Sequence, residues 1–241
     1  MKNQYFGDIN DYRKYGLLRS ILSASGLRLL VAWMLTPDDG STDGKFITYL
    51  ESPEKWSRHD SVLYFGLKEI LTDAQNRRVG LIESMGLLPE AKYYSEIVPD
   101  FASGREQWFG SLYNQAQGCD FVFLDPDNGL EVKSRPYGRK NSSKFLYWRE
   151  VEVLWKAGKS LLIYQHFIRE NRVNYIQRML GALTEATPGS FVEAFSTSNV
   201  VFLMALQPEH RGFHESIVSS VQDSWEGQIH HWELTLAQKA T

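Results

Sequence analysis

The chain has 241 residues, of which 43% are hydrophobic and 23% are charged, as in an ordinary globular protein. Its formal net charge of −3 argues against bulk affinity for nucleic acid but is compatible with a local basic groove. A single cysteine, Cys119, excludes an intrachain disulfide and a zinc site built on cysteines. The sequence has no run of 18 apolar residues and no secretory signal, so we expect a cytoplasmic protein that does not cross a membrane.

Hydrophobic periodicity and stop signals predict helices and strands that alternate along the chain. In chain order we expect a helix at 11–24, a strand at 27–35, a short strand or extended segment at 47–52, helices at 61–74 and 77–88, a strand at 91–98, a helix at 103–117, a strand at 119–125, a helix at 149–158, a strand at 160–167, a helix at 170–186, strands at 191–196 and 200–206, a helix at 214–225 and a strand at 229–236. Ser103 and Glu106 have the spacing of a capping box.

This alternation predicts an α/β fold with a mostly parallel sheet and right-handed crossovers. The strands at 191–196 and 200–206 are separated by a few residues, so we expect an antiparallel pair at the sheet edge. We predict one domain over residues 1–241, from which the basic stretch 133–146 protrudes as a loop insertion.

Three polar loops follow predicted strands, at 36–45, 125–146 and 165–169. Ligands bind where the carboxyl ends of strands meet in an open α/β sheet, so we expect these loops to form one rim. Their candidate side chains are Asp38, Asp39, Asp43, Asp125, Asp127, Asn128, Glu131, Gln165, His166 and Arg169.

Each polar cluster also has an ordinary structural interpretation. The segment 125–129, Asp-Pro-Asp-Asn-Gly, is by itself a turn sequence, because Asn and Gly tolerate a positive φ. The aspartates of 38–43 fit loop or hairpin chemistry, and a lone histidine such as His166 is more often a surface residue than a catalyst. The basic stretch 133–146 fits a solvated loop.

The segment DFVFLDPDNGLE, residues 120–131, resembles the fourth motif of S-adenosylmethionine-dependent amino-methyltransferases, where a strand ends in Asp/Asn-Pro-Pro-Tyr/Phe. The order of segments is similar to that of the J-type ribosomal RNA adenine-N6 methyltransferases, in which a helix and a strand ending in WYP follow. Here REVEVLWKAG and SLLIYQH stand in those places, and 191–210 has the layout of the family's C-terminal half. At the N-terminus, Gly7, Asp11 and Lys14 hold the positions of the family's Gly-Asn-His-Ala-Asp-Val-Leu-Lys-His opening.

The resemblance implies a three-layer Rossmann-like methyltransferase fold, S-adenosylmethionine as cofactor and an adenine in nucleic acid as substrate. Asp125 and Pro126 keep the motif that binds the target amine, whereas Asp127-Asn128 replace Pro and the aromatic residue that stacks on the base. Stacking is then expected from Tyr137 or Tyr164. The loop at 34–44 has fewer glycines than the family's Asp-Thr-His-Ala-Gly-Ala-Gly, so the cofactor site departs from the family pattern.

The resemblance and the loop positions together give three sets of candidate residues. The candidate catalytic residues are Asp125, Pro126, Asp127, Asn128 and His166. The candidate cofactor-binding residues are Lys14, Asp38, Asp39 and Asp43. The candidate substrate-binding residues are Arg135, Arg139, Lys140, Tyr164 and Arg169, with Lys133 and Lys144 as further phosphate contacts.

Two other functions remain open from the sequence. In the first, the carboxylates of Asp125, Asp127, Glu131 and Asp38 or Asp39 bind Mg²⁺ for phosphoester hydrolysis, His166 is the general acid or base, and Lys14 and Arg169 stabilise phosphate charge. In the second, the altered glycine loop marks a methyltransferase-like fold that has lost catalysis and serves as a binding module.

Overall fold

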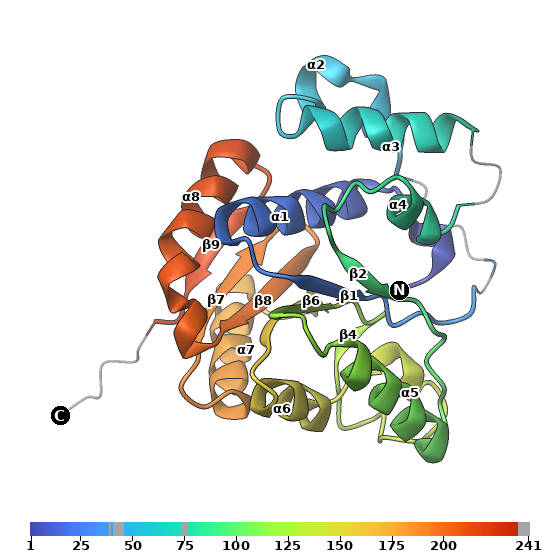
Figure 1. Cartoon of the computed structure of the whole chain (residues 1–241), viewed down its shortest axis with the longest axis vertical. Coiled ribbons are helices and arrows are strands. Elements are labelled where there is room, and N and C mark those ends of the chain that lie inside the picture. Colours follow the sequence, from blue (N-terminus) through green and yellow to red (C-terminus); the bar gives the residue numbers. More distant parts are fainter. Residues whose placement is uncertain (39, 41–45, 74–76, 236–241) are drawn as a thin grey trace.

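A seven-stranded, mostly parallel sheet forms the centre of the computed structural model, which describes residues 1–38, 40, 46–73 and 77–235 (Figure 1). The strand order is β2-β1-β3-β6-β8-β7-β9. These strands are β1 (Leu29–Ala32), β2 (Lys92–Tyr94), β3 (Phe121–Leu124), β6 (Ser160–His166), β7 (Phe191–Ser196), β8 (Val200–Leu206) and β9 (His230–Glu233). Strands β2, β1, β3 and β6 pair in parallel, and β8 is antiparallel to both β6 and β7. The predicted α/β fold class is therefore confirmed.

Helices pack against both faces of the sheet (Figure 1). The α-helices are α1 (Ile9–Ser25), α2 (Pro53–Trp56), α3 (Ser61–Asp73), α4 (Gly80–Ser84), α5 (Ala102–Gln115), α6 (Trp148–Lys156), α7 (Arg172–Ala186) and α8 (His214–Trp225). The 3-10 helices are η1 (Asn3–Tyr5), η2 (Thr48–Glu51), η3 (Ser142–Lys144) and η4 (Pro208–Phe213). One core cluster contains side chains of α1, α3 and α8, and the other contains side chains of α5, α6 and α7. Within the described ranges, no helix is both long and apolar enough to cross a bilayer.

Helix α1 positions the site that is described below. Asp8 is its N-cap and accepts hydrogen bonds from the backbone N–H groups of Asn10 and Asp11, and Gly26 ends the helix with a φ of 65°. Gly16 lies directly against the ring of Trp225 in α8, where a Cβ atom would overlap the ring. This close approach fixes α1 against α8 on one face of the sheet.

Two local predictions were wrong. Residues 47–52 form η2 and its flanks instead of a strand or an extended segment, because Tyr49 packs its ring on Tyr12 of α1 at 5.2 Å between ring centroids, in an aromatic cluster. The predicted capping box of Ser103 does not form, since α5 begins at Ala102 and its N-cap is Phe101, two residues before Ser103.

The antiparallel pair of β7 and β8 is confirmed, and the C-terminal edge region of the sheet is antiparallel as expected, but the outermost strand is β9 and not a member of the pair. Strand β8 lies between β6 and β7, and β9 pairs with β7 to form the edge. The sheet therefore gains one more strand beyond the pair, and this strand protects the apolar β7 from being exposed.

The basic stretch 133–146 is a docked loop. It is closed by a small parallel sheet of β4 (Gly129–Leu130) and β5 (Phe145–Leu146). The Asp100 carboxylate accepts hydrogen bonds from the backbone N–H groups of Asn141 and Ser143, both at 2.8 Å. These bonds attach the end of the loop to the residues that precede α5.

Candidate functional site

A pocket of about 310 Å³ opens at the carboxyl ends of β3 and β6, beside the start of α1. Its lining includes seven candidate residues that the sequence predicted: Lys14, Asp125, Pro126, Asp127, Asn128, Tyr164 and His166. It also includes six residues that the sequence did not single out as site residues: Met1, Tyr5, Asp8, Asn10, Asp11 and Phe46. The expected convergence of loops at the strand ends thus brings together half of the site, and the N-terminal segment supplies the other half.

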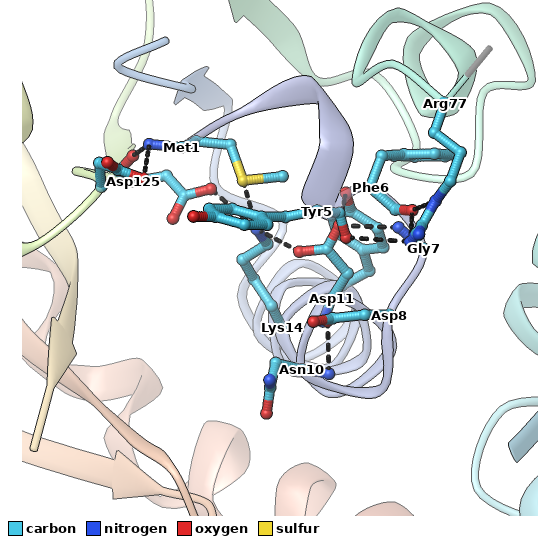
Figure 2. A network of polar contacts seen from close by, with 12 residues as sticks. Met1, Tyr5, Phe6, Gly7, Asp8, Asn10, Asp11, Lys14, Arg77 and Asp125 are labelled. Atoms are coloured by element: carbon cyan, nitrogen blue, oxygen red, sulfur yellow. Dashed lines mark hydrogen bonds and ion pairs between the residues drawn. The ribbon is translucent and has the colours of Figure 1, made fainter. Parts of the chain in front are cut away.

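Lys14 joins the two halves of the pocket through a buried charge cluster (Figure 2). Its Nζ lies 2.7 Å from Oδ1 of Asp11 and 2.8 Å from Oδ2 of Asp125. Burial alone would lower the pKa of Lys14, but the two carboxylates raise it above its ordinary value. Burial raises the pKa of Asp125, and Lys14 opposes that shift. Because Lys14 remains protonated, it holds the Asp125 side chain in a fixed orientation.

Asp8, the N-cap of α1, lies in the wall of the pocket. Burial, followed by the nearby Asp11 carboxylate, raises the pKa of Asp8 to about 6, although the N–H groups at the start of α1 oppose the shift. A positively charged ligand beside Asp8 would favour its ionised form. Binding of such a ligand would therefore lower the pKa of Asp8.

Residues 1 and 2 cross the ends of the central strands. The amino group of Met1 donates hydrogen bonds to the backbone oxygens of Asp125 at 3.1 Å and Met34 at 3.3 Å, and the N–H of Thr36 donates to the Met1 carbonyl at 2.9 Å. Nζ of Lys2 lies 3.7 Å from the Asp127 carboxylate. The crevice between the ends of β1 and β3 is thus filled by the chain itself, and the open space lies on the α1 side.

His166 and Tyr164 form the β6 side of the pocket. Nε2 of His166 lies 3.2 Å from the carbonyl oxygen of Asp127, and its ring meets Tyr164 edge to face at 5.0 Å. Desolvation of the imidazole lowers the pKa of His166 below its ordinary value, so the ring is neutral at pH 7. Burial, helped by Asp125, raises the pKa of Tyr164 well above its ordinary value, so its phenol keeps the proton.

Four carboxylates line the pocket, those of Asp8, Asp11, Asp125 and Asp127. Lys14 and the amino group of Met1 also line it, and Nζ of Lys2 and of Lys144 each lie 3.7 Å from the Asp127 carboxylate. Asp8 is the lining carboxylate that has no ammonium group within ion-pair distance among the described residues. Aromatic rings complete the walls, contributed by Tyr5, Phe46 and Tyr164. Carboxylates and aromatic faces both attract cations, and their attraction is stronger in a partly desolvated site. The lining therefore suits a positively charged ligand.

Several predicted residues lie elsewhere. Asp38 is exposed, accepts a hydrogen bond from the N–H of Gln4 at 3.3 Å and does not line the pocket, while Asp39 and Asp43 are outside the described residues. Oε1 of Glu131 accepts from the N–H of Trp148 at 2.8 Å, at the start of α6. The chain turns away at β4, so Glu131 does not join the aspartates of the pocket.

The predicted phosphate-binding residues are exposed but do not line the pocket: Arg135, Arg139, Lys140 and Arg169. Tyr137, a predicted stacking residue, lies in a different cavity beside α5 and α6, with the Arg149 guanidinium 3.4 Å from its ring centroid. Of the two aromatic residues predicted to stack on a base, Tyr164 is therefore the one that reaches the pocket.

The turn at 125–129 is both a turn and part of the site. Gly129 has a φ of 95°, and a Cβ there would overlap the side chain of Gln165. Oε1 of Gln165 accepts from the N–H of Leu130 at 2.6 Å, and its Nε2 donates to the hydroxyl of Tyr175 at 2.7 Å. Gln165 thus attaches the loop to β6, so that residues 125–128 face the pocket.

No family model matches this chain, and no curated protein matches it. Within residues 1–38, 40, 46–73 and 77–235, no group of three or more His, Cys, Asp or Glu side chains is placed to hold a metal ion. What the site does is therefore inferred from its own side chains and from the resemblance of its motif.

Proposed function

We propose that this protein is a methyltransferase that uses S-adenosylmethionine and transfers the methyl group to an amine nitrogen. Adenine N6 in nucleic acid is the acceptor that the resemblance implies. The observation that carries the proposal is the acidic, aromatic-walled pocket at the end of the middle strand β3, with Asp125 and Pro126 on its wall.

The pocket fits the charge of the cofactor. S-adenosylmethionine supplies a methyl group bound to a positively charged sulfur, and it also carries an ammonium group and a carboxylate. The carboxylates of Asp8 and Asp11 would hold its cationic groups, and the rings of Tyr5 and Tyr164 would face them. The volume of about 310 Å³ is at the lower end of the roughly 300–1,000 Å³ of small-molecule pockets.

Asp125 is proposed to orient the acceptor amine. Its Oδ2 is bonded to Lys14, so among the described residues Oδ1 is left to accept a hydrogen bond from the substrate. A carboxylate held by a buried ammonium cannot rotate away, and this fixes the direction of the nitrogen lone pair. Asp125 therefore has a positioning role, which needs its ionised form.

His166 is proposed to receive the proton that the amine loses. When its Nε2–H donates to the Asp127 carbonyl, Nδ1 carries the lone pair that accepts a proton. The lowered pKa of His166 keeps this lone pair free at neutral pH. The proton then passes to solvent, because His166 is partly exposed.

The fold gives further support. Helices on both faces of the sheet suit the three-layer Rossmann-like arrangement that the resemblance implies. The strands β7 and β8 stand in the order of the family's C-terminal half. Fold likeness alone does not establish an activity, so the weight of the proposal rests on the pocket.

A binding module is a second candidate, favoured by the path of residues 1 and 2. Because these residues fill the crevice between β1 and β3, the pocket would then take a cationic ligand without transferring a group. Hydrolysis with Mg²⁺ is less well supported, because Glu131 points to α6 and Asp125 and Asp127 are engaged by different ammonium groups.

Calorimetry separates the candidates. S-adenosylmethionine should give a saturable heat, and it should bind more tightly than S-adenosylhomocysteine, which lacks the positive sulfur. Transfer of a labelled methyl group to adenine oligonucleotides should follow. Heat with spermidine but none with millimolar S-adenosylmethionine would overturn the methyltransferase and support the binding module.

A further inference from the structure

The acidic pocket continues into a second, larger cavity whose charge is of the opposite kind. This neighbouring groove has a volume of about 620 Å³ and runs along α1, η2 and α2 to the turn between β7 and β8. Phe46 lines both cavities and is thus the boundary between them. Arg13 and Lys55 are the cations of the groove, with Glu51 as its acidic residue.

Phe46 combines an exposed aromatic side chain with a backbone that is held by a hydrogen bond. Its side chain is 69% exposed, although its carbonyl accepts a hydrogen bond from the N–H of Ile9 at 3.0 Å. That bond ties Phe46 to the start of α1, where Asp8 and Asn10 face the acidic pocket. An aromatic ring that is anchored by its backbone and open to solvent offers a stacking surface to a planar group.

The cations of the groove are held by Trp56. The Arg13 guanidinium carbon lies 5.6 Å, and Nζ of Lys55 lies 5.1 Å, from the ring centroid of Trp56. Nε and Nη2 of Arg13 both donate to Oε1 of Gln228, at 3.2 and 2.7 Å, so Nη1 is left to donate. Among the described residues neither cation has a carboxylate within ion-pair distance, so both are available to an anion.

We propose that Phe46, Arg13 and Lys55 form a subsite for an aromatic base joined to a phosphate, with the base stacked on Phe46 and the phosphate held by the two cations. This inference rests on the proposed function, because a nucleotide bound at this subsite would place the adjoining acceptor amine in the pocket lined by residues 125–128. In this chain Asn128 stands where the motif of the resembling family has an aromatic residue that stacks on the base. Phe46 would supply that stacking ring from a segment far from the motif in sequence.

Two sources share this chemistry, a free nucleotide and a nucleic-acid strand, and binding assays distinguish them. A fluorescein-labelled strand of about 12 adenine nucleotides covers the usual site sizes of single-strand-binding proteins. Its affinity is measured by anisotropy on the full chain, without cofactor, and unlabelled ATP is the competitor. If ATP displaces the strand with the same dependence on Phe46, a free nucleotide is sufficient for binding. If the strand binds and ATP does not displace it, the subsite recognises a nucleic-acid strand. Either result supports the subsite.

Phe46→Ala should weaken binding of the strand about ten-fold, and Phe46→Trp should restore it, because stacking on an aromatic ring is tolerant of the ring type. Phe65→Ala is the matched control, since Phe65 is 53% exposed on α3 and outside both cavities; it should leave the affinity within about two-fold. Lys55→Ala should reduce the slope of log affinity against log salt by about 0.7. Lys156→Ala, at a side chain that is 73% exposed on α6, should not.

Two results overturn the subsite. The first is that neither the strand nor ATP binds to a folded chain, and the second is that binding is unchanged by Phe46→Ala. Calorimetry with S-adenosylmethionine on the same samples separates this failure from that of the proposed function. A cofactor heat without strand binding removes the subsite alone, whereas Phe46-dependent strand binding without a cofactor heat removes the methyltransferase alone.

Discussion

The protein buries charge in two places that look alike in the sequence and differ in their surroundings. Arg105 of α5 and Glu150 of α6 form a pair whose side chains are 1% and 2% exposed, with Nε to Oε1 at 2.8 Å and Nη2 to Oε2 at 2.9 Å. The pair is also bonded to the carbonyl of Phe145 and the N–H of Tyr147. One cation meets one anion, and backbone groups bond both partners, while Nη1 of Arg105 has no hydrogen-bond partner among the described residues.

Beside α1, one ammonium meets two carboxylates. Lys14 pairs with Asp11 and Asp125, and Asp8 and Asp127 stand at the same pocket. Backbone N–H groups donate to Asp8 and Asp11, and ammonium groups lie near Asp127, but all four carboxylates also line an open volume. A pair buried between two helices holds them together, whereas carboxylates that line a cavity remain accessible to a ligand. The four predictions that follow test this contrast, from the largest effect to the smallest.

The largest effect is expected from Glu150→Ala. Removal of one partner leaves Arg105 buried and unpaired, which should lower the free energy of unfolding by about 3–5 kcal/mol. Urea unfolding followed by circular dichroism measures it. Glu152→Ala on the same helix removes an exposed pair with Lys156 and should cost less than about 1 kcal/mol. Equal losses in the two variants would contradict a structural role for the Arg105 pair.

Asp8→Asn should change how stability depends on pH. The folded pKa of about 6 exceeds the ordinary value of 3.8, so the folded state binds the proton more tightly. Wild-type stability should therefore fall as pH rises from about 4 to about 6, by up to about 3 kcal/mol for a shift of about two pKa units. Asn keeps the N-cap and does not titrate, so the variant should be more stable than wild type above pH 6 and equal to it below pH 4.

Thermal unfolding at a series of pH values measures this difference. Asp223→Asn, at an exposed carboxylate of α8, is the control and should follow the wild-type profile. A constant difference between Asp8→Asn and wild type at all pH values would show that Asp8 is not the titrating group.

Asp125→Asn should reduce methyl transfer about 100-fold, which is about 2.7 kcal/mol, because the amide presents a donor where the amine needs an acceptor. Lys14 keeps its bond to Asp11, so the loss of stability should be smaller than for Glu150→Ala. Binding of S-adenosylmethionine and transfer rate are measured separately by calorimetry and a labelled methyl assay. Undiminished transfer would show that Asp125 has only a structural role, like the Arg105–Glu150 pair.

The smallest effect is expected from the basic loop. A triple substitution of Arg135, Arg139 and Lys140 by alanine should change the affinity for the adenine strand by less than about two-fold, because the loop is docked at α5 away from the pocket lining. Anisotropy at low salt is the measurement. A loss larger than that of Phe46→Ala would restore these residues as the principal phosphate contacts.

Much of the fold follows from local pattern. The continuous apolar runs of β1, β3 and β6 predict buried parallel strands because both faces of such a sheet are covered. The order of β8 and β9, by contrast, depends on which strand pairs with β7 over long distances, and no local signal carries that information. The prediction for residues 47–52 was wrong for the same reason, because the aromatic cluster that determines their conformation is assembled from separate segments.

The site divides in the same way. Asp125 and His166 were predictable because both follow strands whose carboxyl ends meet at one rim. Asp8 carried a signal that was overlooked, since an aspartate immediately before a helix is a typical N-cap and marks the helix start. Phe46 carried none, because its place depends on how its segment returns to α1. Glu131 was misplaced because the positive φ at Gly129 turns the chain toward α6.

The clamp between Gly129 and Gln165 bears on the kinetics of ligand binding. The loop is bonded to β6 and, through the Tyr175 hydroxyl, to α7, so the site is shaped before a ligand arrives. A preformed site has little ordering entropy to lose, and association then needs no slow conformational step. Substitution of Gly129 by alanine would push Gln165 from its place and convert this into a slower, two-step association. Stopped-flow traces would then change from one phase to two.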